Sequence, residues 1–127
     1  MGMNFTPEQQ KVIELHNSNI LVSAAAGSGK TAVLTERIKK LITDMDDPAD
    51  ITELLVLTFT RASAGEMKTR ISSGIAKALS EAEQEQNTPL VRHLSRQLAL
   101  MSSAQISTLD SFFQTLIRRY FYLIDLD

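Results

Sequence analysis

A short glycine-containing segment constrains the fold of this chain more than any other part of its sequence. Ala24 to Thr31 reads AAAGSGKT, which fits the phosphate-binding loop G-x-x-x-x-G-K-[ST] with alanine in place of the first glycine. The apolar triplet Ile20–Val22 precedes it and predicts a short buried strand. From Lys30 onward apolar residues recur on one helical face, which predicts an amphipathic helix. A strand, a loop and a helix in this order predict a nucleotide-binding unit, against the alternative that the loop only joins strand to helix.

The residue types of this loop suit a triphosphate and its metal ion. Gly27 and Gly29 let backbone N–H groups approach phosphate oxygens, and the helix N-terminus favours negative charge. Lys30 would reach the β- and γ-phosphates, and the Thr31 hydroxyl would bind Mg²⁺. The candidate ATP-binding residues are Gln9, Ala24, Ala25, Ala26, Gly27, Ser28, Gly29, Lys30 and Thr31.

Two interpretations of Gln9 stay open at this point. Thr6, Pro7 and Gln9 form the start signal of a helix, with threonine as the N-cap and glutamine closing a capping box. The same amide offers a donor and an acceptor that could read the edge of an adenine. Local chemistry favours capping at least as strongly as base recognition.

The order of elements predicts an α/β fold with a parallel sheet flanked by helices. We expect helices from Pro7 to about His16, from Lys30 to Ile42, from about Arg61 to Ser80, from Thr88 to about Ser102, and from Leu109 to the end of the sequence. We expect strands at Ile20–Val22, Leu54–Phe59 and Gln105–Thr108, and a solvated loop at Asp44–Asp50.

Composition limits the classes of function. The 127 residues suffice for one domain, and the net charge of −2 argues against a domain that binds nucleic acid through its overall charge, so DNA contacts would be local. The absence of cysteine excludes disulfides and thiolate metal sites and fits a reducing cytoplasm. We expect the isolated His16 and His93 on helix surfaces. No apolar run approaches the roughly 18 residues that a membrane span needs.

Two further segments follow predicted strands and carry hydroxyl groups. Thr58, Phe59, Thr60 and Arg61 end the second strand, at the edge where parallel sheets bind ligands. Phe59 could stack on a base or lie in the core, and spacing alone slightly favours the core. The helix after it carries four basic residues against one glutamate, which suits either DNA or an ordinary solvated face. Thr108 and Ser111 would bind phosphate or cap the last helix.

Taken together, four segments resemble the motifs of superfamily 1 (UvrD/RecB-like) DNA helicases. FTPEQQ, SAAAGSGKT, LTFTRASAGEMKTRI and ISTLDSFFQTLIRRYFYLIDLD are similar, in order, to the Q-motif and to motifs I, Ia and Ib. The ending YFYLIDLD is particularly similar to the AddA members of the bacterial AddAB helicase-nucleases. This resemblance implies a P-loop NTPase of the RecA-like kind. It also implies that residues 1–127 form the N-terminal part of the first motor domain, with the start of an inserted helical region.

The same resemblance implies roles for individual residues. Gln9 would contact adenine, Gly27 to Thr31 would bind ATP and Mg²⁺, and Lys30 would act in catalysis. Single-stranded DNA would lie on Thr58, Phe59 and Thr60, with its backbone on Thr108 and Ser111. Four positions depart from the family pattern: Arg61 stands in place of the usual asparagine, Gly65 of alanine, Asp110 of histidine and Phe113 of cysteine. Arg61 would add a phosphate contact, whereas Asp110 would repel phosphate.

The resemblance also implies a larger assembly. It implies a bacterial cytoplasmic enzyme that acts in double-strand break repair and recombination, with a second, AddB-like subunit. The Asp-Glu strand and the arginine from a second motor domain that such helicases need do not occur among these residues. We therefore expect an incomplete motor domain that binds ATP without useful turnover. The alternative is a stand-alone P-loop regulatory module without helicase activity.

Overall fold

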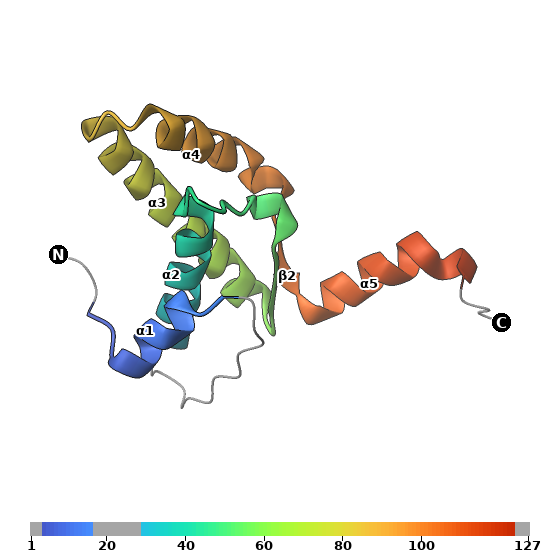
Figure 1. Cartoon of the computed structure of the whole chain (residues 1–127). Helices are drawn as coiled ribbons and strands as arrows, with labels where there is room; N and C mark the ends of the chain where they lie inside the picture. Colours follow the sequence, from blue (N-terminus) through green and yellow to red (C-terminus); the bar gives the residue numbers. More distant parts are fainter. Residues whose placement is uncertain (1–3, 17–28, 124–127) are drawn as a thin grey trace.

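The computed structural model describes residues 4–16 and 29–123 (Figure 1). In chain order its helices are α1 (Pro7–Glu14), α2 (Lys30–Thr43), α3 (Arg61–Gln84), α4 (Thr88–Leu100) and α5 (Leu109–Tyr120). The strands are β1 (Leu55–Thr58) and β2 (Gln105–Thr108), and short 3₁₀ turns cover Ile51–Glu53, Met101–Ser103 and Phe121–Leu123. The strand predicted at Ile20–Val22 and the loop residues Ala24 to Ser28 lie outside the described residues.

The sheet of the described part is small and parallel. β1 pairs with β2 in the register Leu55 to Gln105 through Thr58 to Thr108. The chain passes from β1 through α3 and α4 before it returns as β2, which is the helical crossover that a parallel pair requires. The described residues are therefore richer in helix than the predicted α/β pattern, because two strands of four residues each form the whole sheet there.

Most predicted element boundaries hold within a few residues, and the differences have local causes. β2 begins and ends where the sequence predicted, whereas β1 is shorter than the predicted Leu54–Phe59. α1 ends at Glu14 rather than His16, because Leu15 already has extended backbone angles. α3 continues past Ser80 to Gln84, since Ala82 is buried in the core against which α4 packs. The final helix stops at Tyr120 and gives way to a 3₁₀ turn.

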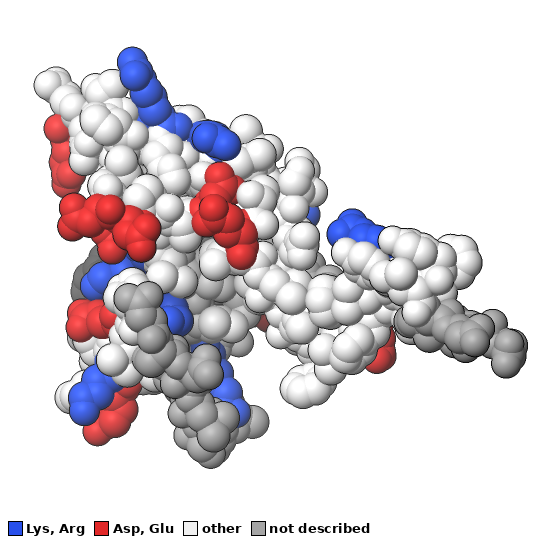
Figure 2. Space-filling model, turned by 45° about the vertical axis from the view of Figure 1, so that its right-hand side comes forward, with Lys and Arg blue, Asp and Glu red and all other residues white. Residues whose placement is uncertain are grey.

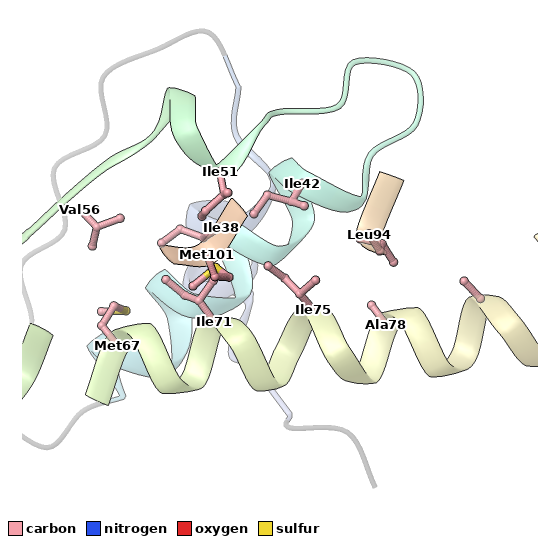
Figure 3. Close-up of a cluster of buried hydrophobic side chains, with 11 residues drawn as sticks. Ile38, Ile42, Ile51, Val56, Met67, Ile71, Ile75, Ala78, Leu94 and Met101 are labelled. Atoms are coloured by element: carbon pink, nitrogen blue, oxygen red, sulfur yellow. The ribbon is translucent and has the colours of Figure 1, made fainter. Parts of the chain in front are cut away.

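The core lies where α2 and α4 pack on α3 (Figures 1 and 3). In Figure 3 the side chains of Ile71 and Ile75 rise from α3 toward Ile38 and Ile42 of α2. Ile42, Ile75 and Leu94 are fully buried. Burying side chains of this size contributes about 1.5–3 kcal/mol each, so this cluster supplies much of the stability of the described part.

A buried glutamine joins α4 to the turn that leads into β1. Gln97 is fully buried, and its Oε1 accepts a hydrogen bond of 2.7 Å from the backbone N–H of Ile51. Its Nε2 donates to Oδ2 of Asp50 at 3.4 Å. Asp50 in turn caps the Ile51–Glu53 turn, where its Oδ1 accepts from the Thr52 hydroxyl at 2.6 Å and from the Thr52 N–H at 3.0 Å. These two donors from Thr52 hold the pKa of the Asp50 carboxyl below its usual range.

Replacing Gln97 by leucine should destabilise the protein. The substitution keeps a side chain of similar size but leaves the N–H of Ile51 buried without its acceptor, which costs about 1–3 kcal/mol. Urea unfolding followed by circular dichroism measures the change. Gln84→Leu, the same substitution at an exposed position of α3, is the matched control and should shift stability by less than about 0.5 kcal/mol. Equal midpoints for Gln97→Leu and the wild type would contradict the structural role of this amide.

The contribution of Asp50 to stability should depend on pH. Because its folded-state pKa is lowered, the unfolded state binds more protons in the acid range, and stability rises with pH there. The contribution is complete at neutral pH and is lost as pH falls below about 3.9 toward the folded-state value. Melting temperatures of the wild type and Asp50→Asn, measured from about pH 7 to about pH 2, should converge at the acid end. A difference that stays constant over this range would contradict the assignment.

Candidate functional site

The candidate nucleotide site is described from Gly29 onward, at the start of α2. Gly29 is the N-cap of this helix and has a φ of +86°, a left-handed conformation that favours glycine. Lys30 and Thr31 follow it in the first turn, and both side chains are exposed. Within the described residues, α2 receives no hydrogen bond from a capping side chain, unlike α1, α3, α4 and α5. The first-turn N–H groups of α2 thus have the arrangement in which helices receive anions.

Gln9 lies beside this helix start. Its Oε1 accepts a hydrogen bond of 2.9 Å from the N–H of Thr6, and its own N–H donates to the Thr6 hydroxyl at 3.2 Å. This confirms the predicted capping box. A Cβ atom added to Gly29 would lie 3.6 Å from Nε2 of Gln9. The Gln9 side chain therefore caps α1 and also lies beside the start of α2. Its contact with adenine stays a prediction.

An arginine that the sequence did not single out fixes α1 on α2. Nη1 of Arg37 donates hydrogen bonds of 2.6 Å to the carbonyl oxygens of both Val12 and Leu15, at the end of α1. The apolar period of α2 places Arg37 among the polar residues of its solvated face, together with Glu36 and Lys39. No local pattern indicated a contact with residues more than twenty positions earlier in the sequence.

The second candidate region lies at the carboxyl ends of the two strands. Thr58 and Thr108 are register partners, so the two segments predicted to bind DNA lie side by side. Each strand leads to a helix that a threonine caps. Thr60 Oγ1 accepts from the Ser63 N–H at 3.1 Å, and Thr108 Oγ1 accepts from the Ser111 N–H at 3.1 Å. The capping interpretation of Thr108 and Ser111 is therefore confirmed, and their contact with DNA stays a prediction.

Phe59 projects from this edge of the sheet. Its side chain is 93% exposed, so the interpretation that places it in the core is wrong for the described part of the chain. Strand β1 ends at Thr58 and α3 begins at Arg61, which leaves Phe59 in the connection, away from the buried face of the strand. Arg61 and Thr60 are exposed beside it, and the Thr58 hydroxyl donates to the Thr60 carbonyl at 3.0 Å.

Charge is distributed rather than gathered on the described surface. On the face in Figure 2, acidic and basic residues alternate over the body of the molecule, and the projecting α5 arm is mostly uncharged. On α3, Arg70 pairs with Glu66 at 2.8 Å, which partly neutralises the predicted basic helix. A groove of about 470 Å³ between α2 and α3 is lined by Lys39 and Lys77 among others, and Glu36 pairs with Lys39 at 3.5 Å. Because these ion pairs partly neutralise the lysines and arginines, we expect DNA to contact a local site rather than a broad basic surface.

Histidines and acidic residues form no metal site among the described residues. Within residues 4–16 and 29–123, three or more His, Cys, Asp or Glu side chains do not gather in a way that could hold a metal ion. His16 is exposed as expected, whereas His93 is partly buried, with Nε2 2.8 Å from the carbonyl oxygen of Ile42 at the end of α2. His93 thus links α4 to α2 instead of lying on a solvated face. Among the same residues, no helix has the length and apolar character needed to cross a membrane.

Phe59→Ala should leave the stability of the chain unchanged, within about 0.5 kcal/mol. The reason is that an exposed ring contributes little packing to the folded state. Ile75→Ala is the reference for a buried position on α3 and should cost about 2–5 kcal/mol. Thermal melts of both variants against the wild type measure the contrast. A melting loss for Phe59→Ala that approaches that of Ile75→Ala would restore the core interpretation.

Comparison with known proteins identifies the family. A model of the UvrD/REP helicase N-terminal domain matches residues 5–127. The chain is 53% identical over 124 residues to the AddA-type subunit of an ATP-dependent helicase/nuclease from Lachnoclostridium phytofermentans, covering 98% of this chain and 9% of that protein. The chain is also similar to the corresponding subunit from Bacillus licheniformis, with 53% identity over 126 residues that cover 99% of this chain and 10% of that protein. It is 50% identical over 127 residues to the subunit from Clostridium perfringens strain 13, which covers 100% of this chain and 10% of that protein. The chain spans about a tenth of the length of these curated relatives. Because the family model covers nearly the whole chain, the chain belongs to the UvrD/REP helicase N-terminal domain family.

Proposed function

We propose that this chain binds ATP and single-stranded DNA as the N-terminal part of the first RecA-like motor domain of an ATP-dependent DNA helicase/nuclease. The domain would include the start of an inserted helical region. The relatives are named as subunits of an ATP-dependent helicase/nuclease, and the similarity extends over nearly all of this chain. In this proposal the parent protein works with a second, AddB-like subunit in double-strand break repair and recombination, in the bacterial cytoplasm.

The observation that carries the nucleotide half of the proposal is the position of Gln9 beside Gly29. A base-reading amide and a phosphate-binding helix start have to lie within the length of one nucleotide, and a Cβ atom added to Gly29 would lie 3.6 Å from Nε2 of Gln9. The exposed Lys30 ammonium would neutralise phosphate charge and assist phosphoryl transfer. Magnesium fits the hydroxyl of Thr31, since Mg²⁺ prefers oxygen ligands and is commonly shared with the phosphates of its substrate.

The DNA half rests on the paired strand ends. Phe59 offers an exposed ring, and base stacking on such rings tolerates any sequence. Thr58, Thr60 and Ser111 add hydroxyls on the same edge, and Arg61 adds a positive charge at the start of α3. Thr108 is buried and caps α5, so its part in this proposal is to hold Ser111 and the start of α5 in place beside the DNA backbone. The combination suits a strand whose bases stack on the protein while its backbone runs over helix starts.

A reciprocal pair of variants tests both halves on the chain itself. Lys30→Ala should weaken ATP binding about tenfold or more, because a charge-assisted contact is lost, and should leave the affinity for a single-stranded oligonucleotide unchanged. Phe59→Ala should weaken oligonucleotide binding by about 1–3 kcal/mol and leave ATP binding unchanged. Calorimetry with Mg²⁺-ATP and fluorescence anisotropy with a labelled oligonucleotide at low salt measure the two affinities.

Each variant is the control for the other, and Lys40→Ala, an exposed lysine further along α2, is the control for loss of charge. Equal ATP affinity of the wild type and Lys30→Ala would refute the nucleotide site. Equal oligonucleotide affinity of the wild type and Phe59→Ala would refute stacking on Phe59. Failure of the wild type to bind ATP at all would refute the proposal as a whole.

A further inference from the structure

We propose that Arg37 is a positioning residue for recognition of the nucleotide base. Its guanidinium fixes α1 on α2 so that the Gln9 amide is held at Gly29, and it thereby sets the preference of the site for adenine. The inference rests on the proposed ATP binding and goes beyond it, because it assigns a role to a side chain that would touch neither the base nor the phosphates.

The contact is made by one nitrogen to two backbone carbonyls. Nη1 of Arg37 lies 2.6 Å from the oxygen of Val12 and 2.6 Å from the oxygen of Leu15. The last carbonyls of a helix have no partner within the helix, and positive charge at this end is favourable. The bond to Val12 is partly buried, so water competes less for it than at a fully exposed site, whereas the bond to Leu15 is exposed. Arg37 therefore acts as a C-terminal cap for α1 that is supplied by α2.

Among the described residues, few other polar contacts hold α1 in place. Ile13 of α1 and Val33 of α2 are buried, and they add non-directional packing. The ion pair between Lys40 and Glu14, at 3.4 Å, is about half exposed on both sides. Such pairs contribute little. The hydrogen bond from Gln10, followed by the contact with Lys40, holds the pKa of Glu14 below its usual range. Among the described residues Arg37 thus supplies the two shortest polar contacts from α2 to α1, and together with the packing of Ile13 they set the orientation of α1.

This orientation matters because α1 is short and carries the recognition amide in its first turn. A helix of eight residues is not stable by itself in water, so its direction is set by docking. Gln9 lies one turn before Val12, and α2 carries Lys30 and Arg37 within its first three turns, directly after its N-cap Gly29. A rotation of α1 on α2 would therefore move the amide relative to the phosphate site while leaving the phosphate site itself intact.

A general structural role and a positioning role make different predictions. If Arg37 only stabilised the fold, its loss would lower the melting temperature and would weaken the binding of all ligands alike. If it acts through Gln9, its loss lowers discrimination between bases and spares the affinity for the phosphates. The effect should also disappear when Gln9 is already removed, because residues that act through one another are non-additive.

The experiment uses the wild type, Arg37→Met, Gln9→Ala and the double variant, with Lys40→Met as the matched control on the same pair of helices. Arg37→Met keeps the aliphatic stem and removes the donors. Calorimetry with ATP, GTP and inorganic tripolyphosphate gives three dissociation constants for each protein, and melting temperatures report folding. We expect Arg37→Met to lower the ATP preference over GTP about fivefold, in line with the loss of one hydrogen bond, while tripolyphosphate affinity stays within about twofold of the wild type. Lys40→Met should leave the preference unchanged, and the double variant should match Gln9→Ala.

Three results would overturn the inference: an unchanged ATP preference in Arg37→Met, a parallel loss of tripolyphosphate affinity, or additive effects in the double variant. If Arg37→Met does not fold, Arg37→Lys replaces it, and the inference then requires an ATP preference between those of the wild type and Gln9→Ala. A preference equal to that of the wild type would overturn it. Loss of ATP binding by the wild type would refute the proposed function, whereas normal ATP binding with unchanged preference in the Arg37 variant refutes this inference alone.

Discussion

Burial of one face of α3 is the interaction on which the rest of the described structure depends. The buried residues of this helix recur every three or four positions from Ala64 to Ala82, and α2, α4 and both strands pack against it. Because α2 carries the candidate nucleotide residues and the strands carry the candidate DNA residues, α3 fixes the two regions relative to each other. Ile71 and Ile75 lie at the centre of this packing, almost without solvent contact.

Hydroxyl-capped helix starts recur at the functional end of the molecule. Thr6, Thr60 and Thr108 each accept a hydrogen bond from an N–H in the first turn of the helix that follows. Asn87 caps α4 through its amide oxygen, so among the described α-helices α2 alone begins without a capping side chain, because glycine is its N-cap. A capping hydroxyl satisfies one of the four free N–H groups of a helix start, whereas a start without a capping side chain leaves that group to an external acceptor as well. The start of α2 therefore offers more free N–H groups to a phosphate than the capped starts of α3 and α5 do.

The sequence predicts the elements of this fold better than its contacts. The capping signal at Thr6, the Thr88–Pro89 start signal and the apolar period of α2 place helices almost where they occur, because these signals are local. The residue that caps α4 is Asn87, one position before Thr88. Gln97 and Arg37 were missed, because each is a polar residue on a helix and only the packing of distant segments buries it or brings it to backbone carbonyls. Spacing alone slightly favours the core for Phe59, but β1 ends at Thr58 and α3 begins at Arg61, so the ring lies in the exposed connection between them. The adjacency of Gln9 and Gly29 likewise depends on the docking of α1, which no spacing encodes.

The pairing of Thr58 with Thr108 has a consequence for how a chain of net charge −2 could hold a polyanion. It brings the beginnings of α3 and α5 to one edge of the sheet, so the positive ends of two macrodipoles point toward the same region. Partial charges of this kind attract a phosphate without adding any formal charge to the protein. They also bring few cationic side chains to the nucleic acid, so fewer condensed counterions are released than at a lysine-rich surface. A DNA strand held in this way would show a shallow dependence of affinity on salt concentration.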